Sequence, residues 1–283
     1  MALDEFALIG RYFRTAQLER ATDASATALG IGDDAALLQL AAGQQLVVST
    51  DSLLAGVHFP ERYPPAELGY RALAVAVSDL AAMTATPLAF TLALSLPTVD
   101  EPWLQAFSLG LAAAARDFAI NLIGGDTTRG PLNIGVTVLG QVPAGQALTR
   151  SGARGGDLLC VGGPLGDGAA GLAVVQGESL QAGLASGVAL HINAAQLPGS
   201  EALSAWAPRQ QLDWMLRGGD DYVLLFTLPA REKVRIAQWR AAGHAVSVIG
   251  SVHAGSGVLL DVGKGYVPVA GERGYQHFRS AND

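Results

Sequence analysis

Four acid-bearing stretches in the first half of the chain have the residue types needed to hold a divalent cation against a phosphate. They are Gly32-Asp33-Asp34, Ser49-Thr50-Asp51, Ser78-Asp79 and Gly124-Gly125-Asp126. Each follows or interrupts an apolar segment, so we expect the carboxylates to lie at element ends and to converge on one cleft. Carboxylates on such turns suit Mg²⁺, which prefers one or two acids completed by water and phosphate oxygens.

The stretch at 122–130 is central to this prediction. An apolar run ends there in Gly124-Gly125, followed by Asp126 and two threonines. Paired glycines let backbone N–H groups come close to a phosphate, and an acid directly after them can hold a cation against it. A Gly-Gly-Asp turn that only joins two strands is the alternative, and it is the more common one for this motif alone. The recurrence of similar acids upstream favours a nucleotide site.

Lysine usage excludes two families of nucleotide-binding architecture. The chain has only Lys233 and Lys264, and none in the acid-rich half. A P-loop needs Gly-Lys-Ser/Thr at a helix start, and a protein kinase needs a strand lysine on the phosphates. Positive charge at a phosphate site must therefore come from metal ions, backbone N–H groups and arginine. Arg150 and Arg154 lie beside glycines in a stretch that either holds phosphate oxygens or is only an inter-domain link.

Composition bounds the class of protein. With 283 residues, half of them hydrophobic, the chain can bury a large core and favours two domains over one. No apolar run reaches the length of a membrane span and the N-terminus lacks a basic start, so we expect a cytoplasmic protein. The single Cys160 excludes an intramolecular disulfide and reads as a core residue. A net charge of -7 without a basic block argues against nucleic-acid or membrane partners.

Hydrophobic periodicity predicts the elements that carry these residues. In the first half we expect helices at 5–14, 67–84 and 101–118 and strands at 37–40, 46–50, 87–96, 120–123 and 132–142. The strands around the turn at 42–44 would place Asp34 and Asp51 at the ends of neighbouring elements. Asp79 falls among apolar positions of the helix at 67–84, where an acid is costly unless it is paired, metal-bound or used as a cap. This order indicates an α/β or α+β domain ending near Arg150.

The second half has its own pattern of short elements. We expect strands at 158–161, 188–197, 223–227 and 245–250, a helix at 230–242 and a closing hairpin.

Taken together, the motifs resemble the thiamine-monophosphate kinases, in order along nearly the whole chain. The matching stretches are Gly30-Ile31-Gly32-Asp33-Asp34, Ser49-Thr50-Asp51, Gly56-Val57-His58-Phe59, Ser78-Asp79-Leu80, Gly124-Gly125-Asp126-Thr127-Thr128, Arg150-Ser151-Gly152, Gly218-Gly219-Asp220-Asp221-Tyr222 and Gly274-Tyr275. The resemblance implies a two-domain fold like that of aminoimidazole-ribonucleotide synthetase. Residues 1–150 would bind ATP and Mg²⁺ and form a dimer-spanning β-barrel, and residues 151–283 would form a C-terminal α/β domain.

The resemblance also implies a reaction and a set of site residues. ATP would phosphorylate thiamine monophosphate to thiamine diphosphate by direct in-line transfer, in a homodimer that uses several Mg²⁺ ions. Metal ligands would be Asp34, Ser49, Thr50, Asp51, Asp79 and Asp126. ATP phosphates would be held by Gly125, Asp126 and Arg150, the last two also acting in catalysis, and thiamine monophosphate would be contacted by His58, Asp220 and Tyr275. A loop histidine packed under Phe59 and a terminal tyrosine anchor are the bland alternatives for His58 and Tyr275.

Two departures from the family pattern leave alternatives open. Asp220 and Val223 stand where relatives carry glutamates, and a longer segment of the relatives, with two more metal-binding acids, has only a short counterpart at 177–187. Either that segment is deleted, or the chain has a break there with a Cα step well beyond about 3.8 Å. The alternative functions are another ATP-dependent synthetase of the superfamily and a non-catalytic ATP-binding relative.

Overall fold

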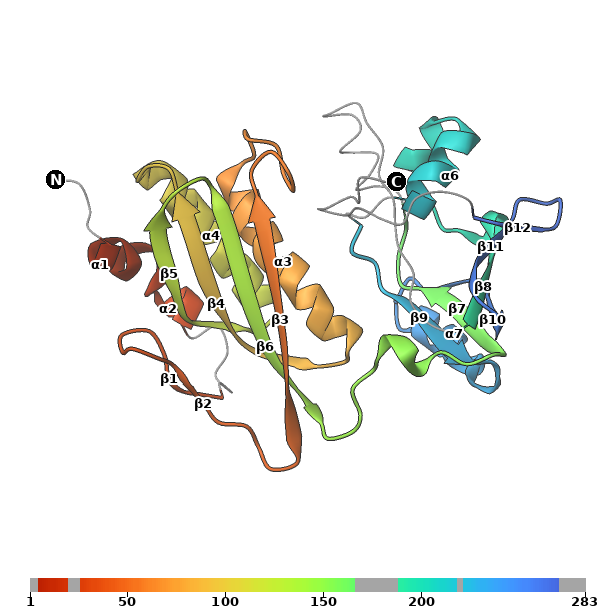
Figure 1. The fold of residues 1–283 in the computed structure, drawn as a ribbon, viewed down its shortest axis with the longest axis horizontal. Coiled ribbons are helices and arrows are strands. Elements are labelled where there is room, and N and C mark those ends of the chain that lie inside the picture. The colour runs from red at the N-terminus through yellow and green to blue at the C-terminus, as the bar shows by residue number, and fades with distance from the viewer. Residues whose placement is uncertain (1–4, 20–25, 166–187, 218–220, 270–283) are drawn as a thin grey trace, which may run out of the picture. The chain divides into compact units, whose positions relative to one another are not determined.

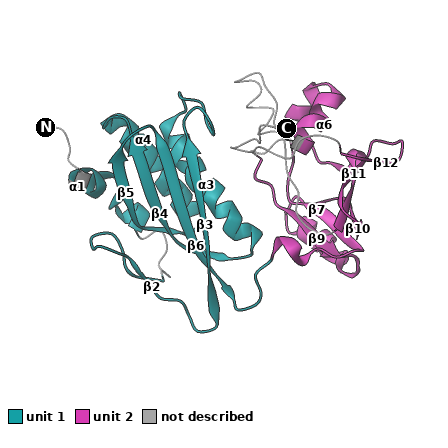
Figure 2. Ribbon diagram, viewed as in Figure 1, with its two compact units in different colours: residues 1–148 teal, residues 149–283 magenta. Residues whose placement is uncertain are grey.

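The computed structural model describes residues 5–19, 26–165, 188–217 and 221–269 (Figure 1). The chain divides into two compact units, Met1–Leu148 and Thr149–Asp283 (Figure 2). Asp220, Tyr275 and the stretch at 177–187 lie outside the described residues. Within the described part, no helix is both long and apolar enough to cross a membrane.

The first unit is built around one sheet with the strand order β3-β6-β4-β5. β6 runs antiparallel to β3 and β4, while β5 lies parallel to β4 and is reached through the crossover helix α4. In chain order the unit contains α1 (Glu5–Leu8), the π-helix η1 (Ile9–Phe13), α2 (Ala16–Glu19), β1 (Thr27–Leu29), β2 (Leu37–Leu38), β3 (Gln44–Leu54), α3 (Pro65–Ala82), β4 (Thr86–Leu96), α4 (Glu101–Asp117), β5 (Asn121–Arg129) and β6 (Asn133–Pro143).

Helices α3 and α4 cover one face of this sheet and enclose the main core (Figure 1). β6 shows why: its even-numbered residues are buried against the helices and its odd-numbered residues face the other way. Asp100 begins α4 by accepting a hydrogen bond from the Trp103 N–H. A Cβ at Gly110 would overlap the backbone carbonyl of Ala66, so the close crossing of α3 and α4 requires glycine there.

The opposite, outer face of the sheet is covered only in part. β1 and β2 form a two-stranded ribbon, whose neighbouring residues pack on Leu88, Ala89 and Ile123. Leu46 and Val48 of β3 lie on the outer face and are 46% and 54% exposed. Among the described strands the sheet is open and does not close into a barrel.

The second unit is a six-stranded sheet with the order β12-β11-β8-β10-β7-β9. β8 and β11 are parallel, and every other neighbouring pair is antiparallel. One face packs on α7 through Ile236 and Trp239. In chain order the unit contains η2 (Arg150–Gly152), β7 (Asp157–Val161), β8 (Val188–Asn193), η3 (Ala194–Gln196), η4 (Ala202–Ala205), α6 (Pro208–Arg217), β9 (Leu225–Pro229), η5 (Ala230–Glu232), α7 (Val234–Ala241), β10 (Ser247–Ala254), β11 (Gly257–Asp261) and β12 (Tyr266–Pro268).

Most predicted elements are confirmed within a few residues, but the expected positions of two motifs at element ends are wrong. Ser49-Thr50-Asp51 lies inside the 11-residue strand β3, and Gly124-Gly125-Asp126 lies inside β5. The strand expected at 37–40 is the two-residue β2, which pairs with β1 and not with β3. Cys160 is buried as predicted, and this burial raises the pKa of its thiol.

Candidate active site

The side chains of Ser49 and Asp51 lie on the helix-covered face of β3. Residues two apart on a strand share a face, and these two alternate with the exposed positions of the strand. Thr50 points to the opposite face, where its Oγ1 lies 2.8 Å from Oγ1 of its cross-strand partner Thr137. The side chain of Thr50 is therefore separated from the other two by the sheet, and its metal-binding role stays a prediction.

Asp79 of α3 meets this pair from the helix layer. The hydroxyl of Ser49 donates a 2.5 Å hydrogen bond to Oδ2 of Asp79, which is short for an O–H to carboxylate bond. Asp79 is half-buried among buried residues of α3 such as Leu80. Ser49 is therefore a hydrogen-bond partner for this acid, which the sequence predicts to be paired, metal-bound or a cap.

Asp51 lies in a setting that disfavours its charged form. Burial, and then the neighbouring charge of Asp79, raises the pKa of the Asp51 carboxyl above its ordinary value. Among the described residues no ion pair neutralises either acid. Two facing carboxylates and a hydroxyl, all hard oxygen donors without a cationic partner, fit the chemistry of Mg²⁺.

Asp126 lies at the other edge of the same sheet. Asp51 is on the edge strand β3 and Asp126 on the edge strand β5, with β6 and β4 between them. Three inter-strand spacings amount to about 14 Å, too far for one ion to be bound by both acids. Accordingly, no group of three or more acidic, histidine or cysteine side chains in the described part of the chain can hold one metal. Within a single chain Asp51 and Asp126 therefore do not share one ion, and the convergence of all the acids on one cleft stays a prediction.

The backbone conformation before Asp126 requires the glycine at position 125. Residue 123 is an extra residue in the pairing of β5 with β4, where Phe90 pairs with Leu122 and Thr91 with Gly124. Gly125 then takes a φ of 154°, and a Cβ there would overlap the carbonyl oxygen of Leu92. Glycine is needed here for the approach of two strands, whether or not a phosphate is bound. Asp126 itself is exposed.

Asp34 and Arg150 lie apart from the pair of acids on β3 and α3. Asp34 is exposed just before β2, and its N–H donates to Oδ1 of Asp33 at 2.8 Å. The ribbon that carries it packs on the outer face of the sheet, opposite to Ser49 and Asp51. Arg150 is exposed at the start of η2 in the second unit. The roles predicted for both residues stay predictions.

His58 is fixed by the turn that follows β3. Its Nδ1 accepts a hydrogen bond from the Leu54 N–H at 3.0 Å, so a neutral ring carries its proton on Nε2. The His58 carbonyl also accepts from the guanidinium of Arg71 at 3.2 Å. Phe59 beside it is buried and packs edge to face on Tyr63. His58 is thus held in place by its own loop. This agrees both with a substrate contact and with a loop histidine that has no role in binding.

Sequence reasoning missed two polar pairs. Thr137, the partner of Thr50, alternates regularly within β6 and gives no signal of its own. Asn193 and Asp261 are register partners at the ends of β8 and β11. A polar residue directly after a short apolar run is the signal that would have found this second pair.

Comparisons with known proteins agree along the chain. Residues 32–142 match the family AIR synthase related protein, N-terminal domain. The thiamine-monophosphate kinase of Escherichia coli K12 is 41% identical, over 98% of this chain and 99% of its own length. The chain belongs to the thiamine-monophosphate kinase family.

Solved structures of family members match the fold as well. The crystal structure of thiamine-monophosphate kinase from Stenotrophomonas maltophilia K279a is 39% identical, with a TM-score of 0.81 over 92% of this chain and 98% of that one. AaThiL complexed with AMPPCP and TMP is 26% identical, with a TM-score of 0.72 over 98% of this chain and 99% of that one. The alignment with the Escherichia coli kinase spans 328 positions, whereas this chain has 283 residues, so it leaves positions of that kinase without a counterpart here.

Proposed function

We propose that this member of the thiamine-monophosphate kinase family transfers the γ-phosphoryl group of ATP to the phosphate of thiamine monophosphate, giving thiamine diphosphate and ADP. The observation that carries the proposal is the 41% identity to the Escherichia coli kinase along the full length of both chains. We further propose that the enzyme is a cytoplasmic homodimer that requires Mg²⁺, with its ATP and metal sites in residues 1–150.

The central difficulty of the reaction is bringing two anionic phosphates together. When bound, Mg²⁺ supplies positive charge that offsets this repulsion and the charge of the transferring group. Asp51 and Asp79 would hold an ion, because they are facing acids with no cationic partner among the described residues. Ser49 would fix the orientation of the Asp79 carboxylate through its short hydrogen bond, so that little reorganisation is needed when the ion binds.

Asp126 would serve a separate ion or the nucleotide phosphates. Its exposed position on the edge strand β5 leaves its carboxylate accessible, and the separation from Asp51 requires a second site. The resemblance implies several ions, which accommodates two groups of acids on one sheet. Arg150 would add positive charge at the phosphates, where the first half has no lysine to supply it.

His58 would contact thiamine monophosphate. The Leu54 N–H donates to its Nδ1, which holds the ring in the turn after β3. Asp220 and Tyr275 remain the other proposed contacts, by resemblance alone.

The outer face of the first sheet supports the homodimer. The 11-residue edge strand β3 exposes three aliphatic side chains on this face. They are Leu46, Val48 and Leu54, which are 41–54% exposed. A row of exposed aliphatic side chains on a sheet is typical of an interaction surface. Pairing two such faces would bury these residues and would produce the dimer-spanning barrel that the resemblance implies.

The proposal is tested by an ADP-release assay with ATP, thiamine monophosphate and Mg²⁺, combined with chromatographic detection of thiamine diphosphate. We expect ADP and thiamine diphosphate in equal amounts and no reaction after chelation of Mg²⁺. ADP release without thiamine diphosphate would indicate another ATP-dependent enzyme of the superfamily. Tight ATP binding without any turnover would indicate the non-catalytic relative.

A further inference from the structure

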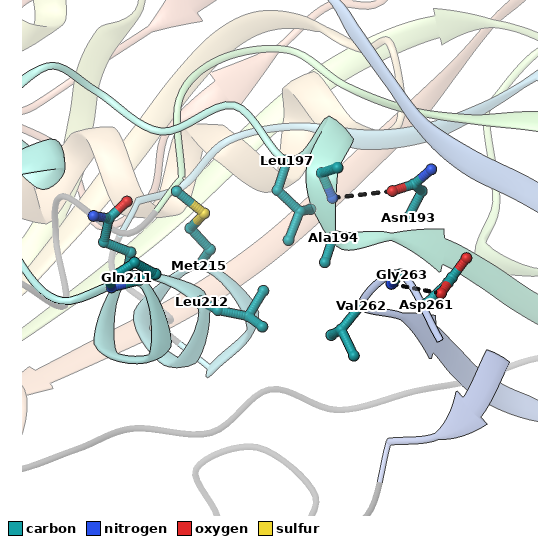
Figure 3. Close-up of a pocket in the computed structure, with 11 residues that line it drawn as sticks. Asn193, Ala194, Leu197, Gln211, Leu212, Met215, Asp261, Val262 and Gly263 are labelled. Atoms are coloured by element: carbon teal, nitrogen blue, oxygen red, sulfur yellow. Dashed lines mark hydrogen bonds between the residues drawn. The ribbon is translucent and has the colours of Figure 1, made fainter. Parts of the chain in front are cut away.

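The second unit contains a pocket that none of the predicted site residues lines. It has a volume of about 520 Å³, within the range of about 300–1,000 Å³ typical of small-molecule sites. The pocket lies where the parallel strands β8 and β11 both end, and α6 forms its other wall (Figure 3). Ligands of sheets with parallel strands commonly bind at the carboxyl ends of the strands.

Two apolar walls face each other across this pocket. Leu212 and Met215 of α6 form one wall, and Val262, in the turn after β11, lies on the other side (Figure 3). Leu197 closes the space between them. Val262 is 52% exposed although it lines a concave surface, so the pocket offers apolar area that a flat ring could cover.

The polar side chains at the rim are held in place by their own turns. Asp261 Oδ1 accepts hydrogen bonds from the N–H groups of Gly263, Lys264 and Gly265 at 2.8, 3.1 and 3.0 Å. Asn193 Oδ1 accepts from the Ala195 N–H at 3.0 Å, which also fixes which end of the amide is oxygen. These bonds use one atom of each side chain. They leave Asp261 Oδ2 as an acceptor and Asn193 Nδ2 as a donor.

Acceptor and donor are neighbours because Asp261 and Asn193 are register partners in the parallel pair of β11 and β8. An adjacent acceptor and donor complement a ring edge that carries an amino group next to an unprotonated ring nitrogen. We propose that this pocket binds an aminopyrimidine ring, with Asp261 accepting from the amino group, Asn193 donating to the ring nitrogen, and the ring lying between the apolar walls.

The source of the ring rests on the proposed function. ATP and thiamine monophosphate both contain an aminopyrimidine, fused within adenine in the first and free in the second. The chemistry at the rim is the same for both, so the experiment has to separate them. Adenosine and thiamine lack the phosphates that bind metal, and therefore they report the ring contact alone.

The test is calorimetric titration of the full chain with adenosine and thiamine, each beside its deaminated analogue, inosine and oxythiamine. These analogues replace the amino group by a carbonyl and the ring nitrogen by N–H, which reverses donor and acceptor. We expect one of the two aminated compounds to bind and its analogue to bind about tenfold more weakly. The compound that binds identifies the source of the ring.

Two variants reverse the rim while keeping its turns. Asp261→Asn and Asn193→Asp each retain the Oδ1 that accepts the backbone N–H groups, and each exchanges the other atom between acceptor and donor. Each single change should weaken the aminated ligand about tenfold, and the double variant should prefer the deaminated analogue. Glu232→Gln, which removes a surface charge outside the pocket, is the matched control and should change nothing.

The outcomes separate this inference from the proposed function. Binding of neither aminated compound to the wild type, or unchanged preference in the double variant, overturns the aminopyrimidine site. If the double variant does not fold, the single variants decide the question, because an unchanged preference for the aminated compound in both of them overturns the site. Thiamine diphosphate formation by the wild type is measured in parallel. A kinase without ring discrimination refutes only the pocket, and ring discrimination without kinase activity refutes only the kinase.

Discussion

Ser49 of β3 and Asp79 of α3 are joined by a hydrogen bond of 2.5 Å that connects the sheet of the first unit to the helix layer above it. Thirty residues separate them in the chain. The bond brings an acid from an otherwise apolar helix next to Asp51, two positions further along β3, whose pKa is raised by burial and by the charge of Asp79. The fold therefore places two acids close together where burial and the charge of Asp79 disfavour the charged form of Asp51, which costs stability and suits a cation.

Replacing Asp51 by Asn should stabilise the metal-free protein and weaken its response to Mg²⁺. The folded-state pKa of Asp51 is raised, so the folded state binds more protons than the unfolded state between the ordinary pKa and the raised one. Stability contributed by this group is thus lost as pH rises through that window, and the full penalty is present above the raised pKa. We expect a melting temperature a few degrees higher at pH 7 without metal, and at least about tenfold lower kinase activity.

The control for that variant is Ser52→Ala, on the exposed face of the same strand. It should change neither the melting temperature nor the kinase activity. Scanning calorimetry from pH 4 to 7 with and without Mg²⁺ measures both effects. Equal melting temperatures for wild type and Asp51→Asn at every pH would show that the charge of Asp51 does not destabilise the metal-free protein.

Asp126→Asn should lower turnover about a hundredfold with little change in stability. The side chain is exposed on β5, so its charge matters for a bound cation or phosphate and not for packing. Gly125→Ala should instead lower the stability of the protein, because its Cβ would overlap the Leu92 carbonyl and disturb the pairing of β5 with β4. Turnover per folded molecule and thermal unfolding are measured for both. A destabilised Asp126→Asn with normal turnover would assign this acid to structure.

The sequence predicts the elements of the first unit well because their patterns are local. The helix at 67–84 and the strand at 132–142 follow from apolar periods of 3.6 and 2, and both are found. Local signals also identify Asp79 as an acid on an apolar helix, whereas its grouping with Ser49 and Asp51 is seen only in the structure.

What the sequence could not provide is the order of strands across the sheet. β6 is the last strand of the unit in the chain, yet it lies between β3 and β4. This insertion places Asp126 far from Asp51, and nothing in the residues around either acid indicates it. The Gly124-Gly125 pair suggests a turn, whereas the close approach to Leu92 keeps these glycines within a strand. Tertiary packing therefore overrides the turn propensity of these residues.

His58→Ala should raise the Michaelis constant for thiamine monophosphate about tenfold and leave that for ATP unchanged, because the residue is assigned to the acceptor alone. Since Nδ1 of His58 also accepts from the Leu54 N–H, the alanine variant removes a loop contact as well. His58→Asn supplies an oxygen near the position of Nδ1 and separates the two effects. It should restore the melting temperature but not the Michaelis constant. Parallel increases for both substrates would contradict the assignment.

Val48→Glu should convert the proposed dimer into a monomer. Val48 is 54% exposed on the outer face of β3, between the similarly exposed Leu46 and the hydroxyl of Thr50. A charge buried in an apolar interface without a partner costs several kcal/mol, roughly the free energy that distinguishes a micromolar dimer from a monomer at assay concentrations. Leu109→Glu is the matched control, because Leu109 is 60% exposed on α4, the helix layer on the other face of the sheet. Sedimentation velocity should give twice the monomer mass for the wild type and for Leu109→Glu, and the monomer mass for Val48→Glu. Thermal unfolding distinguishes a folded monomer from a misfolded chain. A Val48→Glu protein that remains dimeric would place the interface elsewhere, and the exposed leucines and valine of β3 would then need another partner.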